Sequence, residues 1–202
     1  MLQLNHVTVT RGEREVLSDC TFQFQEGKAY VIMSEDSDDY KAFLKSACRE
    51  KATRRGEIIT WEGSVIYNGV DDMYLPRFLT IREYLKELVE VSEHLTTVGA
   101  LIKRLKIEEN ELGTTIGKLS ESTGAALRLA PVYATNPYVV IFGEPFPDDD
   151  LLCMFINEQK NDKVIIIATT DKKKAGRIAS VIDGEVLSME SGGFKTIVNG
   201  DM

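Results

Sequence analysis

The acidic segment Ser34–Lys41 is the first part of the chain whose residue types could do chemistry. It reads SEDSDDYK and directly follows the short apolar run Ala29–Met33. Such a run predicts a strand buried on both faces, and the apolar spacing after the segment predicts a helix. Carboxylates are favoured beside a helix N-terminus, so the segment is predicted to be a solvated capping turn. A divalent-cation site is the less favoured alternative, and we predict no metal site.

Glu144 is the second candidate, because it follows another apolar run, Tyr138–Phe142. A carboxylate at the end of a buried strand could serve as a general base if a proton lay within its reach. A local hydrogen-bonding role at the strand end is the simpler interpretation. The positive charge of a site that uses Glu144 as its base could come from Lys41 or from the run Lys172–Lys174. Such a run more often marks the solvated start of a helix.

The composition is that of a folded, acidic protein. The chain has 202 residues, of which 43% are hydrophobic and 28% charged, and its formal net charge is −8. These values favour one compact domain over residues 1–202 and argue against nucleic acid as a partner, because binding its backbone requires a basic surface. The longest apolar runs are too short to span a bilayer. With Cys20, Cys48 and Cys153 far apart in the sequence, we expect a cytoplasmic protein with reduced thiols and no direct membrane insertion.

The elements that would position these residues alternate between sheet and helix. Leu2–Thr10 and Thr21–Gln25 alternate apolar with polar residues, which predicts a half-buried antiparallel layer. The apolar runs, to which Val164–Ala168 belongs, predict a mostly parallel core sheet. The stretch from about Tyr74 to Lys118 lacks such a run and is predicted to be a helical insert. Helical spacing marks Tyr40–Cys48, Ile81–Val91, Val98–Leu105 and Leu119–Ala134, the last of which Pro131 should kink.

The segment GEREVLSDCTFQFQEGKAYVIMSEDSDDYKAFLKSA resembles the opening of an ATP-binding-cassette (ABC) ATPase, without a gap through the phosphate-binding loop. In that family the loop reads GxxxxGK(S/T): glycines wrap the phosphates, the lysine neutralises them and the hydroxyl holds magnesium. The resemblance places Ser34, Ser37, Asp39, Tyr40 and Lys41 in this loop. Tyr40 replaces the lysine, Lys41 replaces the hydroxyl, and no loop glycine is retained. Because the loop's carboxylates would oppose a triphosphate, we predict that it does not bind ATP.

A second segment, LSESTGAALRLAPVYATNPYVVIFGEPFPDDD, resembles the family's run from the signature motif to the D-loop, again without a gap. The family's signature LSGGQ reads LSEST here. Ser120 is retained, but Glu121 stands where a glycine would approach the γ-phosphate. In the strand that follows, Gly143 replaces the aspartate that orients magnesium, while Glu144 matches the catalytic glutamate. The resemblance therefore implies that Glu144 is a residual general base. The signature motif is predicted to be non-functional.

A third segment, DKVIIIATTDKKKAGRIASVIDGEV, resembles the family's last core strand and switch region. Thr170 occupies the position of the switch histidine, and Arg11 that of the aromatic residue that stacks on adenine. The glutamine at the entry to the helical subdomain falls near Val70. The two histidines of the chain, His6 and His94, are both far from the switch position in the sequence. Each replacement removes a contact that the family makes with nucleotide.

The resemblance implies an α/β fold of the P-loop NTPase class: an ABC ATPase domain with a mostly parallel core sheet, an N-terminal antiparallel β layer and a short helical subdomain. The replaced motif residues predict a subunit that neither binds nor hydrolyses ATP, needs no cofactor and acts as a structural or regulatory partner. Its partners would be an ABC transmembrane subunit, a second and active ATPase subunit, or both, at the inner face of the membrane; a homodimer is a further option. The alternative is a divergent ATPase that powers transport with ATP and Mg²⁺ and uses Glu144 as its base.

Overall fold

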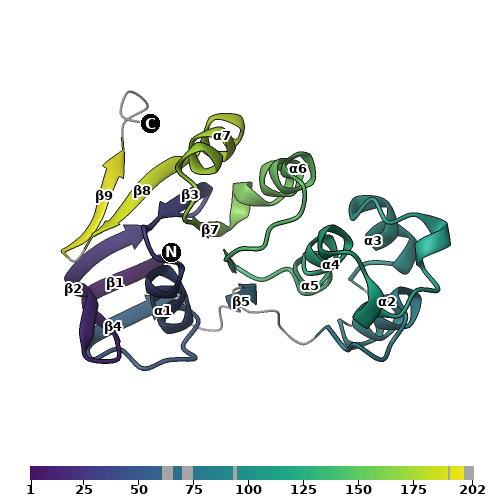
Figure 1. The fold of residues 1–202 in the computed structure, drawn as a ribbon, viewed down its shortest axis with the longest axis horizontal. Helices are drawn as coiled ribbons and strands as arrows, with labels where there is room; N and C mark the ends of the chain where they lie inside the picture. The colour runs from purple at the N-terminus through teal and green to yellow at the C-terminus, as the bar shows by residue number, and fades with distance from the viewer. Residues whose placement is uncertain (61–65, 70–74, 93–94, 191, 198–202) are drawn as a thin grey trace. The chain divides into compact units, whose positions relative to one another are not determined.

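The computed structural model describes residues 1–60, 66–69, 75–92, 95–190 and 192–197. Val70, Tyr74 and His94 lie outside these residues. The chain divides into two compact units, whose elements are drawn in Figure 1. Unit 1 contains Met1–Asp71, Tyr138–Glu144 and Cys153–Met202, and unit 2 contains Asp72–Pro137 and Pro145–Leu152.

Unit 1 begins with a three-stranded antiparallel sheet in the order β2-β1-β4. Its strands are β1 (Leu2–Arg11), β2 (Arg14–Phe24) and β4 (Arg55–Thr60). The predicted alternation is present, since Leu2, Leu4, Val7 and Val9 of β1 are buried. The strand β4 was missed by the sequence analysis. It approaches β1 so closely that a Cβ on Gly56 would lie 2.2 Å from the backbone oxygen of His6, and its φ of +74° also favours glycine.

The second sheet of unit 1 has six strands in the order β5-β6-β7-β3-β8-β9. The strands from β5 to β8 in this order pair in parallel, and β9 is antiparallel to β8. Every residue of β6 and β7 is buried, which explains their unbroken apolar runs. The prediction of a mostly parallel core sheet is therefore confirmed. The bounds are β3 (Lys28–Met33), β5 (Ile66–Gly69), β6 (Val139–Phe142), β7 (Val164–Thr169), β8 (Glu185–Glu190) and β9 (Gly193–Ile197).

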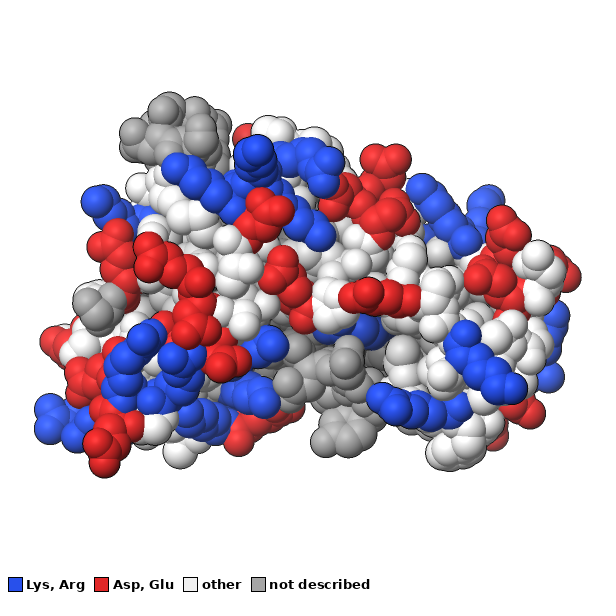
Figure 2. Space-filling model, in the orientation of Figure 1, with Lys and Arg blue, Asp and Glu red and all other residues white. Residues whose placement is uncertain are grey.

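Two helices of unit 1 follow core strands, α1 (Ser37–Ala47) after β3 and α7 (Lys172–Ile182) after β7. The buried side of α1 joins a core that contains residues of both sheets, with Phe43 among its fully buried side chains. The side of α7 that carries Ile178 and Ile182 is buried as well. Lysine and arginine side chains gather over α7 on the face of the molecule shown in Figure 2.

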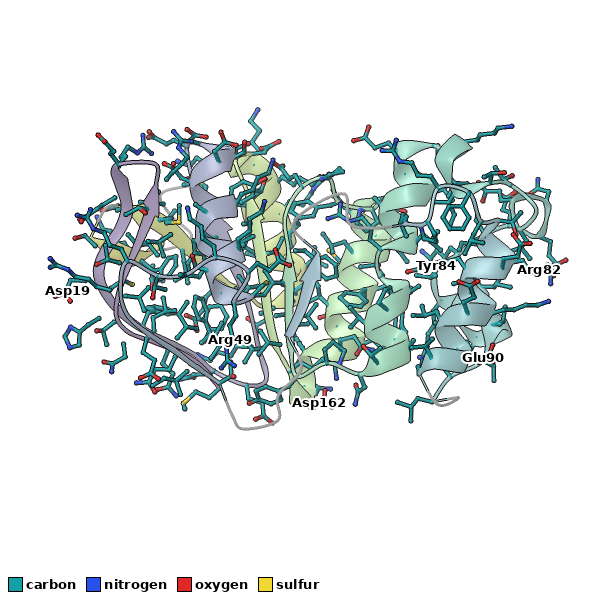
Figure 3. The ribbon with its side chains drawn as sticks, turned by 90° about the horizontal axis from the view of Figure 1, so that it is seen from below. Asp19, Arg49, Arg82, Tyr84, Glu90 and Asp162 are labelled. Atoms are coloured by element: carbon teal, nitrogen blue, oxygen red, sulfur yellow. The ribbon has the colours of Figure 1, made fainter. Side chains whose placement is uncertain are left out.

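Unit 2 is built mainly from short helices. They are α2 (Ile81–Val91), α3 (Val98–Arg104), α4 (Glu121–Leu127) and α5 (Ala130–Thr135), with 3-10 turns at Glu109–Glu111 and Ile116–Lys118. A capping box between Thr80 and Glu83 begins α2. Arg82 and Glu90 lie on the exposed side of α2, and Tyr84 is half-buried (Figure 3). Among the described residues, no helix combines the length and the apolar character that crossing a bilayer requires.

One detail corrects the sequence-based expectation for the helices. The helix predicted over Leu119–Ala134 is divided rather than kinked, because Pro131 lies in the first turn of α5, where its missing N–H costs no hydrogen bond. The acidic residues that follow Pro147 begin α6 (Asp149–Gln159), where the Asp148 carboxylate accepts a hydrogen bond from the Leu151 N–H at 3.0 Å.

Candidate functional site

The candidate site lies in unit 1 at the carboxyl end of β3, where open parallel sheets commonly bind ligands. Only Ser34, Glu35 and Asp36 separate β3 from α1, because the helix begins at Ser37. Asp36 is the N-cap, and its Oδ1 accepts a hydrogen bond from the Asp38 N–H at 2.9 Å. Its backbone oxygen accepts from the N–H groups of Asp39 and Tyr40. The chain itself therefore occupies amide groups with which a phosphate-binding loop would contact an anion.

Arginine side chains from the neighbouring antiparallel sheet reach the carboxylates of this segment. Arg11 Nη1 lies 2.6 Å from Asp36 Oδ2, 3.2 Å from Asp39 Oδ1 and 3.5 Å from Asp38 Oδ2. Arg14 donates a hydrogen bond to the second carboxylate oxygen of Asp39. We call these five residues the arginine–aspartate cluster. In it the two arginines pair with three of the four carboxylates of the segment Ser34–Lys41.

The acids are thus partly neutralised inside the fold, which the sequence analysis did not anticipate. The pKa of the Asp36 carboxyl is lowered, first by the hydrogen bond from the Asp38 N–H and then by Arg11, so this carboxylate stays ionised. Within the described residues, no group of three or more His, Cys, Asp and Glu side chains is placed to hold a metal ion.

Tyr40 and Glu144 form the second half of the site. Tyr40 is 1% exposed, and its hydroxyl donates to Glu144 Oε2 over 3.4 Å. The hydroxyl of Thr169, at the end of β7, donates to Glu144 Oε1 over 2.8 Å and accepts the Asp171 N–H at 3.0 Å. Burial, followed by the Glu144 charge, raises the pKa of Tyr40 to about 12, so its hydroxyl remains a donor at neutral pH. Both oxygens of the carboxylate therefore accept a hydrogen bond from the protein.

The structure brings most of the predicted site residues together but not all of them. Ser34 donates its hydroxyl to the backbone oxygen of Asp36, Ser37 is the first residue of α1, and Lys41 is half-exposed on the same helix. Ser120 belongs to unit 2, where its side chain caps α4 by accepting the Thr123 N–H at 3.1 Å. Thr170 is exposed after β7.

Sequence reasoning missed Arg14 and Thr169. A signal for Arg14 was present, because Arg11-Gly-Glu-Arg14 forms a basic turn whose charge complements the acidic segment Ser34–Lys41. Thr169 follows an unbroken apolar run and gave no comparable signal, since its role depends on the adjacency of β6 and β7 in the sheet.

Comparison with solved structures identifies the architecture. No known family's sequence pattern matches the chain, and no curated protein matches it in sequence. An ATP-binding subunit of an ABC transporter has a TM-score of 0.76 at 17% identity, covering 100% of this chain and 91% of that one. The dimeric structure of a bacterial ABC transporter cassette gives 0.73 at 16% identity, with 96% and 97% coverage.

The chain has the fold of an ABC transporter ATP-binding cassette. A dimeric cassette in a post-hydrolysis state, bound to ADP and phosphate, is similar over the same length, with a TM-score of 0.74 at 17% identity. At these identities the likeness establishes the fold alone. The predicted P-loop NTPase class, with an antiparallel N-terminal layer and a parallel core sheet, is therefore confirmed.

Proposed function

We propose that this protein is an ABC-fold subunit that works without binding or hydrolysing ATP, as a structural or regulatory partner of other ABC subunits. The observation that carries the proposal is the arginine–aspartate cluster, which occupies the start of α1 with the protein's own charges. We also propose that residues 1–202 act as one ABC-like domain with a helical insert over about 74–118.

Three properties of the site support the loss of ATP binding. The helix begins at Ser37, so no wide loop is left between β3 and α1 to surround phosphates. The four carboxylates and two guanidinium groups of this region leave it with a net negative charge, which disfavours a triphosphate. The position expected for the motif lysine holds Tyr40, which is buried and cannot supply a positive charge.

The proposed partners follow from the fold. ABC cassettes similar to this chain are dimeric in solved structures, and another similar chain belongs to a metal-chelate type ABC transporter. We propose that this chain docks on an ABC transmembrane subunit, on an active ATPase subunit, or on both, at the cytoplasmic face of the membrane. A homodimer is the further option.

Isothermal titration of the full chain with Mg-ATP tests the central claim. We expect no saturable heat, while an ABC ATPase with intact motifs titrates under the same conditions. Saturable micromolar binding would overturn the proposal.

Chemical crosslinking in native membranes, followed by identification of the crosslinked peptides, tests the role as a partner subunit. We expect crosslinks to ABC subunits. Their absence from a membrane that retains the protein would argue against this role.

A divergent ATPase is the second candidate. Glu144 is held by hydrogen bonds just after β6, and its position in the sequence matches that of the family's catalytic glutamate. Phosphate release distinguishes the two functions. Our proposal gives the same baseline for the wild type, for Glu144→Gln and for the exposed control Glu57→Gln. A rate that falls only in Glu144→Gln would favour the ATPase.

A further inference from the structure

Unit 1 contains a pocket beside the arginine–aspartate cluster, where the paired strands β3 and β8 end (Figure 1). Its volume is about 440 Å³, within the roughly 300–1,000 Å³ that small-molecule sites occupy. Met33 pairs with Ser188 in the parallel ladder, so Glu35 and Glu190 each follow this pair by two residues. Both glutamates line the pocket, because the two strands end at the same edge of the sheet.

The wall of this pocket is acidic. Glu35 and Glu190 are exposed, and neither side chain forms an ion pair or a hydrogen bond with the part of the chain that the structure describes. Among the described residues that line the pocket, none is basic. Lys195 lies opposite Ser188 in β9, yet it pairs with neither glutamate within the described ranges. The charges of both glutamates are therefore uncompensated and favour a cation.

Asp39 adds a third carboxylate, which lies deeper. The residue is 8% exposed, Arg14 donates to its Oδ2, and Arg11 Nη1 lies 3.2 Å from its Oδ1. Even so, Oδ1 accepts no hydrogen bond from the described residues. A buried carboxylate oxygen normally accepts at least one hydrogen bond, so the wall of the pocket carries an unsatisfied acceptor. A ligand with an N–H group would supply the missing donor.

The pocket suits an organic cation better than a metal ion. Within the described residues, no three acidic side chains are placed to hold one ion, so the carboxylates act as separate partners. Met33 and Met189 also line the pocket, and flexible thioether side chains pack well against methylene groups. Two ammonium groups joined by a methylene chain match these features.

We propose that this pocket binds a small aliphatic diamine. One ammonium group pairs with Glu35 and donates to Asp39, and the other pairs with Glu190. The methylene chain lies against Met33 and Met189. The inference rests on the proposed function, because a bound triphosphate would place its own charge at the same end of β3.

The experiment is a titration of the ¹⁵N-labelled full chain at constant ionic strength, followed by the amide shifts of Glu35 and Ser188. The probes are putrescine, which is a four-carbon diamine, and its analogues butylamine and butanediol. We expect putrescine to bind with a dissociation constant on the order of 1 mM, a reasonable value for so small a ligand. Butylamine should bind roughly 5-fold more weakly, because it lacks one charge pair, and butanediol should give no saturable shift.

Two variants remove one carboxylate charge each and keep the size of the side chain. Glu35→Gln and Glu190→Gln should fold normally, because both residues are exposed. Each should lower the affinity for putrescine roughly 5-fold, the loss expected for one partly exposed ion pair. The matched control is Glu57→Gln, which changes an exposed glutamate of β4 outside the pocket and should leave the affinity unchanged.

Equal affinity for putrescine and butylamine, or equal losses in Glu190→Gln and Glu57→Gln, would overturn the proposal. Tighter binding of acetyl-lysine amide than of putrescine would overturn it in favour of a lysine side chain of a protein partner. The ATP question is answered separately. Saturable binding of Mg-ATP would overturn the proposed function, whereas a chain that binds neither Mg-ATP nor putrescine would overturn only the diamine site.

Discussion

The Thr169→Val variant tests whether Glu144 is held by the fold. Thr169 is fully buried, and its hydroxyl joins the Glu144 carboxylate to the Asp171 N–H. Valine has nearly the same shape and favours strands, so the change removes two hydrogen bonds without opening a cavity. The bond to a charged acceptor contributes about 1.5–3 kcal/mol and the bond from a backbone N–H about 0.5–1.5 kcal/mol. We therefore expect a loss of about 2–4.5 kcal/mol.

For a chain of this size the loss corresponds to a fall in Tm of roughly 5–15 °C. Urea unfolding followed by far-UV circular dichroism measures it, with Thr196→Val, an exposed change in β9, as the control. Combining Thr169→Val with Tyr40→Phe completes a double-mutant cycle. Tyr40→Phe alone should cost below about 1 kcal/mol because its bond is long, 3.4 Å. If Thr169→Val cost no more than Thr196→Val, the assignment of Glu144 as a structural acceptor would be wrong.

Three further predictions concern the same site. Arg11→Gln should lower the urea midpoint more than the exposed control Arg55→Gln, and the gap should shrink in 1 M NaCl, where charge interactions are screened within about 3 Å. Asp36→Asn keeps a capping oxygen but cannot ionise. Because the folded pKa of Asp36 is lowered, its charge stabilises the fold above the unfolded pKa near 4, and the wild type should lose its advantage over Asp36→Asn as pH falls below that value. Because the folded pKa of Tyr40 is raised to about 12, the wild type should lose stability between pH 10 and 12, and Tyr40→Phe should lose less over the same range. Denaturant unfolding at the stated pH values measures both.

The sequence was most informative where a pattern repeats along the chain. Val164–Ala168 and Tyr138–Phe142 are apolar at every position because parallel strands are covered on both faces, and this predicted the core sheet. The short strands β4 and β5 carry neither strict alternation nor an apolar run, and they are defined by pairing with β1 and β6. Their formation depends on contacts between distant segments, which local pattern cannot reveal.

In the candidate site, too, the sequence identified individual residues but not the contacts between distant segments. Tyr40 and Glu144 could be named from their spacing to the apolar runs and from the resemblance to the ABC family. Their hydrogen bond could not, since it joins residues 104 positions apart. Likewise, the acidic segment Ser34–Lys41 was visible as a source of negative charge, but the arginines that compensate it come from the opposite ends of the turn between β1 and β2.

The early start of α1 sets a condition for protein engineering. Restoring the glycines and the lysine of a phosphate-binding loop would have to unwind the first turn of a helix that Asp36 caps and that Arg11 and Arg14 hold in place. A lysine at position 40 would enter a site that is 1% exposed and already filled by an aromatic ring. Each single replacement would be placed on a backbone that is already helical at this position. A designer would therefore need to exchange the loop, the helix start and both arginines together.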